Sequence, residues 1–137
     1  MPRYCIDANA LVIYINEEKT GKEIKKIMKE IETDKSTGFM SMVNLAEFHR
    51  AMIRIFSENL ADKYVTWLKE SKIIIISPSI EIATLASIKK QKYASARVSF
   101  AWGDAFCLAT AIEYDVNFII TSDPEFEKVR EIPIIFI

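Results

Sequence analysis

Hydrophobic residues along the chain fall into two alternating kinds of segment, short uniformly apolar runs and longer stretches with helical periodicity. The apolar runs predict strands at 3–6, 37–41, 73–77, 116–123 and 132–137. The run at 73–77 is β-branched and bounded by Ser-Pro, and it predicts a fully buried strand. Pro133 suits a strand at the edge of the sheet or at its own first position.

The stretches between these runs predict helices. In residues 20–33, isoleucines and a methionine recur at helical spacing on an otherwise charged segment, which is the pattern of an amphipathic helix. The other predicted helices cover 8–17, 41–56 with Ser41 as N-cap, 58–69, 79–92 and 102–115. Alternating strands and helices predict an α/β fold with three α/β/α layers and a small parallel sheet of four to five strands. Ligands of such folds bind beyond the carboxyl ends of the strands.

Composition changes this picture little. The chain has 137 residues, half of them hydrophobic and 27% charged, which predicts one globular domain over residues 1–137. Its net charge of −1 gives no global basic field for nucleic acid. Cys5 and Cys107 lie in apolar runs, where we expect small buried hydrophobes. No apolar run is long enough for a membrane span and no signal peptide is visible, so we expect a cytoplasmic protein.

Four acidic residues are placed to reach one edge of the predicted sheet. Asp7 follows the first strand, Asp123 follows the strand FIITS, Glu47 lies in the helix after the second strand, and Asp104 opens the helix before FIITSD. Each acid also has an ordinary interpretation. Asp7 and Asp123 could cap helices, Asp123 with a proline at the first helical position. Glu47 could form a surface ion pair with Arg50.

Asp104 is harder to explain as a surface residue. Its helix is apolar almost all round, and no lysine or arginine is near it in the sequence. Carboxylates gathered at short range raise one another's pKa, and a hard divalent cation such as Mg²⁺ with its oxygen ligands removes that conflict. A single histidine and scattered cysteines argue against zinc. The pattern favours a metal site over four independent caps.

The segments IDANALV, SMVNLAEFHR, DAFCLATAIEYDVNFIITSD and the closing EF resemble the PIN-domain ribonucleases, especially the small VapC-type toxins. The resemblance spans nearly the whole chain in the family's order. It implies that Asp7, Glu47, Asp104 and Asp123 are the metal-binding and catalytic acids, supported by Asn9 and Thr121. Asn9 stands where Ser or Thr is frequent in the family, and the segment before Asp104 is more apolar than the pattern suggests.

The resemblance implies hydrolysis of RNA phosphodiester bonds with Mg²⁺ or Mn²⁺. In that reaction the metal lowers the pKa of a water and stabilises the leaving 3′-oxygen. We assign Asp7 and Asp104 as principal ligands, Asp123 as completing the site directly or through water, and Glu47 as holding a water or a second ion. Similar toxins form homodimers and are inhibited by a cognate antitoxin, so both partners are expected here.

Other polar and aromatic residues have weaker assignments. Arg50 and Arg54 share a helical side with Glu47 and could contact RNA phosphates, although solvated surface charge is an equal alternative. His49 points elsewhere and is expected at the surface or an interface. Trp67 and Trp102 could stack on bases, but packing is the favoured interpretation.

Other function classes are weaker alternatives. A non-catalytic PIN-like module that binds RNA or protein would be favoured if an acid were missing, and none is. A receiver domain requires a lysine after the last strand, and this chain ends IPIIFI without one. An Asp-x-Asp phosphatase requires a second aspartate at the position that Asn9 occupies. Nucleotide-cofactor enzymes are disfavoured because Gly21, Gly38 and Gly103 are isolated and form no phosphate loop.

Overall fold

The structure, a computed structural model, describes residues 1–95 and 97–137, without the side chain of Thr20. Five parallel strands form one sheet in the order β3-β2-β1-β4-β5. They are β1 (Arg3–Ile6), β2 (Thr37–Ser41), β3 (Ile74–Ile76), β4 (Phe118–Thr121) and β5 (Ile134–Phe136). The α-helices are α1 (Ala8–Ile15), α2 (Lys22–Glu32), α3 (Met42–Ile55), α4 (Glu58–Glu70), α5 (Ile80–Tyr93) and α6 (Trp102–Glu113). Two 3₁₀ helices complete the list, η1 (Lys19–Gly21) and η2 (Pro124–Lys128).

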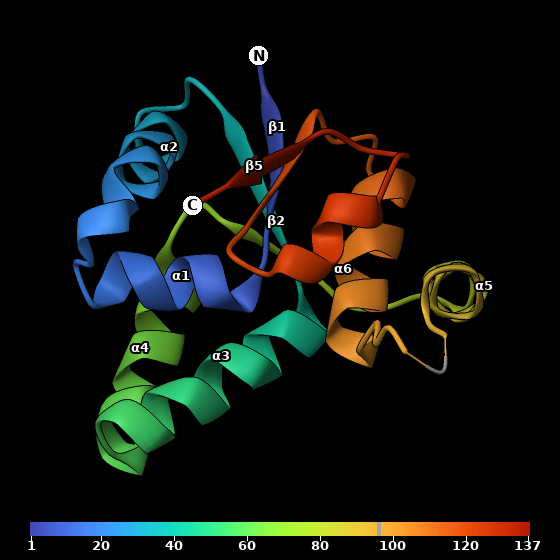
Figure 1. The fold of residues 1–137 in the computed structure, drawn as a ribbon. Helices are drawn as coiled ribbons and strands as arrows, with labels where there is room; N and C mark the ends of the chain where they lie inside the picture. Colours follow the sequence, from blue (N-terminus) through green and yellow to red (C-terminus); the bar gives the residue numbers. More distant parts are fainter. Residues whose placement is uncertain (96) are drawn as a thin grey trace.

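Helices cover both faces of the sheet, so the predicted three-layer α/β/α architecture is confirmed (Figure 1). One core packs α1 to α4 against the sheet, and the other packs α5, α6 and η2 against the opposite face. Strand β1 serves both cores because successive side chains point to opposite faces. Tyr4 and Ile6 lie in the first core, and Cys5 lies in the second.

Four of the α-helices, α1, α3, α4 and α5, begin at a short polar side chain that caps the first turn. The Ser41 hydroxyl accepts a hydrogen bond from the backbone N–H of Val43, so the predicted N-cap is confirmed. The segment predicted as one helix from 20 to 33 divides into η1 and α2. Within the described residues, no helix is both long and apolar enough to cross a membrane.

The prediction that the isoleucine run at 73–77 is a fully buried strand is wrong. Strand β3 pairs only with β2 and forms an edge of the sheet, and Ile74 is 45% exposed. A uniformly β-branched run does not distinguish a central from an edge strand, because β propensity does not encode how many strands pair with it. Strand β5 at the other edge agrees with the position of Pro133.

The order of the strands creates a switch point beside β1. The chain runs from β1 to β2 and β3 on one side, and then returns to place β4 on the other side of β1. At such a point the loops after neighbouring strands diverge and leave a crevice at the carboxyl edge. Asp7 follows β1 and Asp123 lies two residues after β4, so both acids stand at this crevice.

Candidate active site

A cleft of about 520 Å³ opens at the carboxyl ends of β1 and β4. Among the described residues that line it are five acids and no lysine or arginine. The acidic residues of the cleft are Asp7, Glu18, Glu47, Asp104 and Asp123. The cleft therefore concentrates negative charge that no basic side chain of its own lining offsets, and this favours a cation as its ligand.

Asp7 is the most deeply buried of these acids and has the most hydrogen bonds. Its Oδ1 accepts from the backbone N–H of Ala8 at 2.8 Å, which makes it the N-cap of α1. Its Oδ2 accepts from the Asn9 side-chain amide at 3.0 Å and from the Thr121 hydroxyl at 2.8 Å. Asp7 thus ties the end of β1 to α1 and to the end of β4.

Burial raises the pKa of Asp7 to about 6. The hydrogen bonds from Thr121 and Ala8 stabilise the carboxylate and limit the rise, and the negative charges of Glu47 and Asp123 add to it. A carboxyl that is 97% buried therefore stays mostly ionised at neutral pH because donors surround it.

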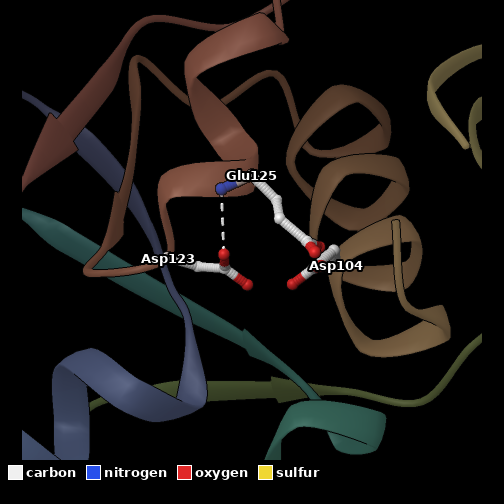
Figure 2. A group of neighbouring side chains, drawn as sticks. All are labelled: Asp104, Asp123 and Glu125. Atoms are coloured by element: carbon white, nitrogen blue, oxygen red, sulfur yellow. Dashed lines mark hydrogen bonds between the residues drawn. The ribbon is translucent and has the colours of Figure 1, made fainter. Parts of the chain in front are cut away.

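A second group of acids faces Asp7 from α6 and η2. One carboxylate oxygen from each of Asp104, Asp123 and Glu125 lies within 4.8 Å of the others. Figure 2 shows the three side chains pointing toward one another, Asp104 from α6 and the other two from the segment after β4. Asp123 accepts from the backbone N–H of Glu125 at 2.9 Å and caps η2. Asp104 accepts from the backbone N–H of Ala101 at 3.2 Å.

The pKa values of Asp104 and Glu125 are shifted in opposite directions in this group. Burial, a hydrogen bond shared with Glu125 and the nearby charges of Asp123 and Asp7 raise the pKa of Asp104 to about 9. The pKa of Glu125 is lowered, first by the hydrogen bond from the Ser99 hydroxyl and then by the one from Asp104. Without a cation the group keeps a proton on Asp104, and oxygen-ligand chemistry of this kind suits Mg²⁺ or Mn²⁺.

Glu47 enters the cleft from α3, one turn after Asn44. The Asn44 side-chain nitrogen donates to Glu47 Oε1 at 2.8 Å, to the Gly103 carbonyl at 3.1 Å and, at 3.4 Å, to Asp7 Oδ1. Gly103 lies so close to the Glu47 carboxylate that a Cβ added there would collide with it. Asn44 and Glu47 of α3 therefore both contact α6 at Gly103.

The structure brings the predicted acids together. Asp7, Glu47, Asp104 and Asp123 all line the cleft, with Asn9 beside them. Thr121 is buried behind Asp7 and donates to it. The expectations that Asp7 and Asp123 cap helices also agree with the structure, so cap and cleft positions coincide.

The predicted basic residues lie elsewhere. Arg50 and Arg54 are exposed and are not among the residues that line the cleft. No ion pair joins Glu47 to Arg50 in residues 1–95 and 97–137. His49 is 2.8 Å from Asp62 on α4, at the surface, as expected.

Sequence reasoning missed Asn44 and Glu125. Asn44 lies three residues before Glu47, on the same helical face, and this spacing could have indicated a contact. Glu125 follows Asp123 by two residues, directly after Pro124, but no sequence pattern shows that the 3₁₀ turn brings it back to Asp104. Ser99, which contacts Glu125 from a loop 26 residues earlier, gave no signal.

Comparison with known proteins identifies the family to which the chain belongs. The family model described as the PIN domain matches residues 4–132. The chain belongs to the PIN-domain family. No curated protein sequence matches it. The segments at Asp7, Glu47, Asp104 and Asp123 all fall inside the matched residues.

Solved structures with the same fold come from toxin–antitoxin systems. A chain of VapBC2 from Rickettsia felis, bound to a DNA fragment from its promoter, has a TM-score of 0.77 at 13% identity, covering 98% of each chain. DNA-bound VapBC from Salmonella typhimurium has a TM-score of 0.77 at 14% identity, covering 99% of this chain and 98% of that one. VapC20 from Mycobacterium tuberculosis, a toxin that cleaves the sarcin-ricin loop, has a TM-score of 0.73 at 10% identity and covers 95% and 98%. Identities this low show a shared fold.

Proposed function

We propose that this PIN-domain protein is a metal-dependent endoribonuclease and the toxin of a toxin–antitoxin pair. The observation that carries the proposal is the meeting of Asp7, Asp104 and Asp123 in one cleft whose described lining includes no lysine or arginine. Structural neighbours such as the sarcin-ricin-loop-cleaving toxin support the choice of RNA as substrate. A single domain over residues 1–137 and a cytoplasmic location stay predictions from the sequence.

The donor set fits a hard divalent cation. It offers carboxylate oxygens only, the closest three within 4.8 Å of one another. Burial and then the neighbouring acids raise the pKa of Asp104, and a cation would relieve the repulsion between these acids. Asp7, Asp104 and Asp123 would hold the ion, with Glu125 as an additional ligand and Glu47 at the α3 side of the cleft. A bound Mg²⁺ or Mn²⁺ would supply an activated water and stabilise the leaving 3′-oxygen.

The chain's own residues prepare this chemistry. Thr121 and Asn9 hold the Asp7 carboxylate in one orientation by hydrogen bonds to Oδ2. Asn9 Oδ1 also accepts from the backbone N–H of Ser122 at 2.8 Å, which fixes the loop that carries Asp123. The acids are thus positioned before a substrate phosphate arrives, and such preorganisation lowers the cost of stabilising the transition state.

A protein partner is supported by a second surface. A groove of about 680 Å³ lies between α1, α2 and α4. The rings of Tyr14 and Trp67 stack within it with their centroids 6.2 Å apart. Other residues that line the groove include Lys25, Lys29 and Lys63. The complexes named VapBC among the neighbours motivate an antitoxin as partner. The homodimer stays a prediction.

The test is cleavage of a labelled structured RNA with Mn²⁺ or Mg²⁺, beside EDTA and the variant Asp7→Asn. Metal-dependent cutting lost in both controls is the expected result, and the matched variant Asp115→Asn, at an exposed aspartate beyond α6, should cut like the wild type. Failure to bind Mn²⁺ in calorimetry would refute the nuclease and favour a non-catalytic binding module.

A further inference from the structure

The contacts of Asn44 set it apart from the other buried polar residues. It lies in the first turn of α3, fully buried, and its side-chain nitrogen faces three acceptors from three elements. These acceptors fix the orientation of the amide, since turning its oxygen toward Glu47, Asp7 and the Gly103 carbonyl would place four oxygens together. The amide carries two hydrogens for three acceptors, so the longest contact, to Asp7, is shared.

The other end of the amide shows that Asn44 is not optimised for packing. Its Oδ1 is buried and has no hydrogen-bond partner among the described residues. A buried acceptor without a partner destabilises the folded state, and an apolar side chain of similar volume would avoid that penalty. Asn44 lies one turn before Phe48, another buried residue of α3, and leucine would be an ordinary choice at such a position. The hydrogen bonds that the Asn44 side-chain nitrogen donates must therefore account for the presence of asparagine at this position.

Gly103 supplies the second half of the same arrangement. A Cβ at this position would overlap the carboxylate of Glu47, which is the flexible far end of that side chain, and not the backbone of α3. An alanine at 103 could therefore be accommodated by moving Glu47 away, with the two helices left in place. Gly103 has no positive φ that would require glycine for its backbone. Its missing side chain makes room for the carboxylate.

We propose that Asn44 and Gly103 are positioning residues that together hold the Glu47 carboxylate at the metal-binding cleft. Glu47 is an exposed residue on a helix, and without these contacts its side chain would sample several rotamers. Asn44 fixes one carboxylate oxygen by a hydrogen bond, and Gly103 leaves the space in which the whole carboxylate lies. This inference rests on the proposed function, because it concerns the acid that completes the cleft.

The experiment measures Mn²⁺ affinity by calorimetry and metal-free melting temperature for Asn44→Leu and Gly103→Ala. Matched controls are Asn59→Ala, at an exposed position of α4, and Gly21→Ala, where an added Cβ would meet Ile13 at an ordinary 3.4 Å. Residues that orient metal ligands typically affect affinity by about 10- to 100-fold. We expect a loss of about that size in both variants, an unchanged or higher melting temperature, and no loss in the controls.

A double-mutant cycle separates positioning from a general structural effect. If Gly103 acts through Glu47, Gly103→Ala should change Mn²⁺ affinity less than about twofold once Glu47→Ala is present. Full additivity, or unchanged affinity in both single variants, would overturn the proposal while leaving the nuclease intact.

Metal-free crystal structures of the same variants provide a readout that needs no activity. The Glu47 carboxylate should be displaced in Gly103→Ala and should lose its fixed rotamer in Asn44→Leu. If the wild type bound no Mn²⁺ at all, the proposed function would fail, and these structures would still decide whether the two residues position Glu47. A Glu47 side chain that stays in place in both variants would refute positioning.

Discussion

Binding of Mn²⁺ to the cleft should release about one proton at pH 7. With pKa values of about 6 for Asp7 and about 9 for Asp104, about one tenth of Asp7 and nearly all of Asp104 carry a proton at this pH. A cation binds the ionised carboxylates, so both protons must leave. The release should rise to about 1.5 protons at pH 6 and fall to about one half at pH 9.

Calorimetry measures this number directly. The titration is repeated in buffers with different ionisation enthalpies, and the slope of the observed enthalpy against buffer enthalpy gives the protons released per ion. Asp115→Asn, at an exposed aspartate, should leave the slope unchanged. Asp104→Asn should reduce the release at pH 7 to about one tenth of a proton. Tight binding without proton release at pH 7 would refute the view that crowding in the cleft holds a proton on Asp104.

Three further predictions concern stability. The raised pKa of Asp104 in the folded state destabilises the fold as the pH increases above the unfolded pKa of about 4. Asp104→Asn should therefore stabilise the metal-free protein at pH 8 by at least about 1.4 kcal/mol, measured by urea unfolding with EDTA. A destabilised variant would contradict this. Burial alone would raise the pKa of Glu131, but hydrogen bonds from Lys89 and Tyr93 lower it to about 2. The ionised Glu131 should therefore contribute about 1 kcal/mol to the free energy of unfolding above pH 4.5, and this contribution should disappear between about pH 4.5 and 2. Glu131→Gln should flatten that part of the acid titration. Phe48→Ala should cost about 3–5 kcal/mol in the same unfolding assay, because the ring is fully buried in the first core, whereas a loss below about 1 kcal/mol would show that the core repacks.

The sequence was sufficient to predict the layers and the meeting of the four acids at one edge of the sheet, because both depend on local signals. Uniform apolar runs between amphipathic stretches leave few folds other than a covered parallel sheet. In such a sheet the residues that follow neighbouring strands lie close together. Asp7 directly follows β1, and Asp123 lies two residues after β4. Glu47 and Asp104 required the additional step of counting helical turns from a strand end.

Features that depend on the order of the strands could not be read from the sequence. The position of β3 at the edge is set by which strands flank β1, and no local pattern of the isoleucine run encodes it. Contacts across the cleft are equally non-local. Asn44 and Gly103 are 59 residues apart, and Ser99 and Glu125 are 26 apart. Arg50 and Arg54 share a helical side with Glu47, but the described residues of α3 that line the cleft are Glu47 and Ala51.

The interpretation of Asp7 and Asp123 as helix caps and their interpretation as metal ligands are compatible, for a physical reason. A carboxylate has two oxygens with about four acceptor positions, so one backbone N–H leaves capacity for other partners. The N-termini of α1, α6 and η2 all carry acids that border one cleft, Asp7 and Asp123 as caps and Asp104 in the first turn. The positive ends of these helices offset part of the repulsion between the acids, which lets the group persist before a cation binds. An acid that follows a buried strand and begins a helix is therefore suited to both roles, and evidence for the cap is no evidence against the ligand.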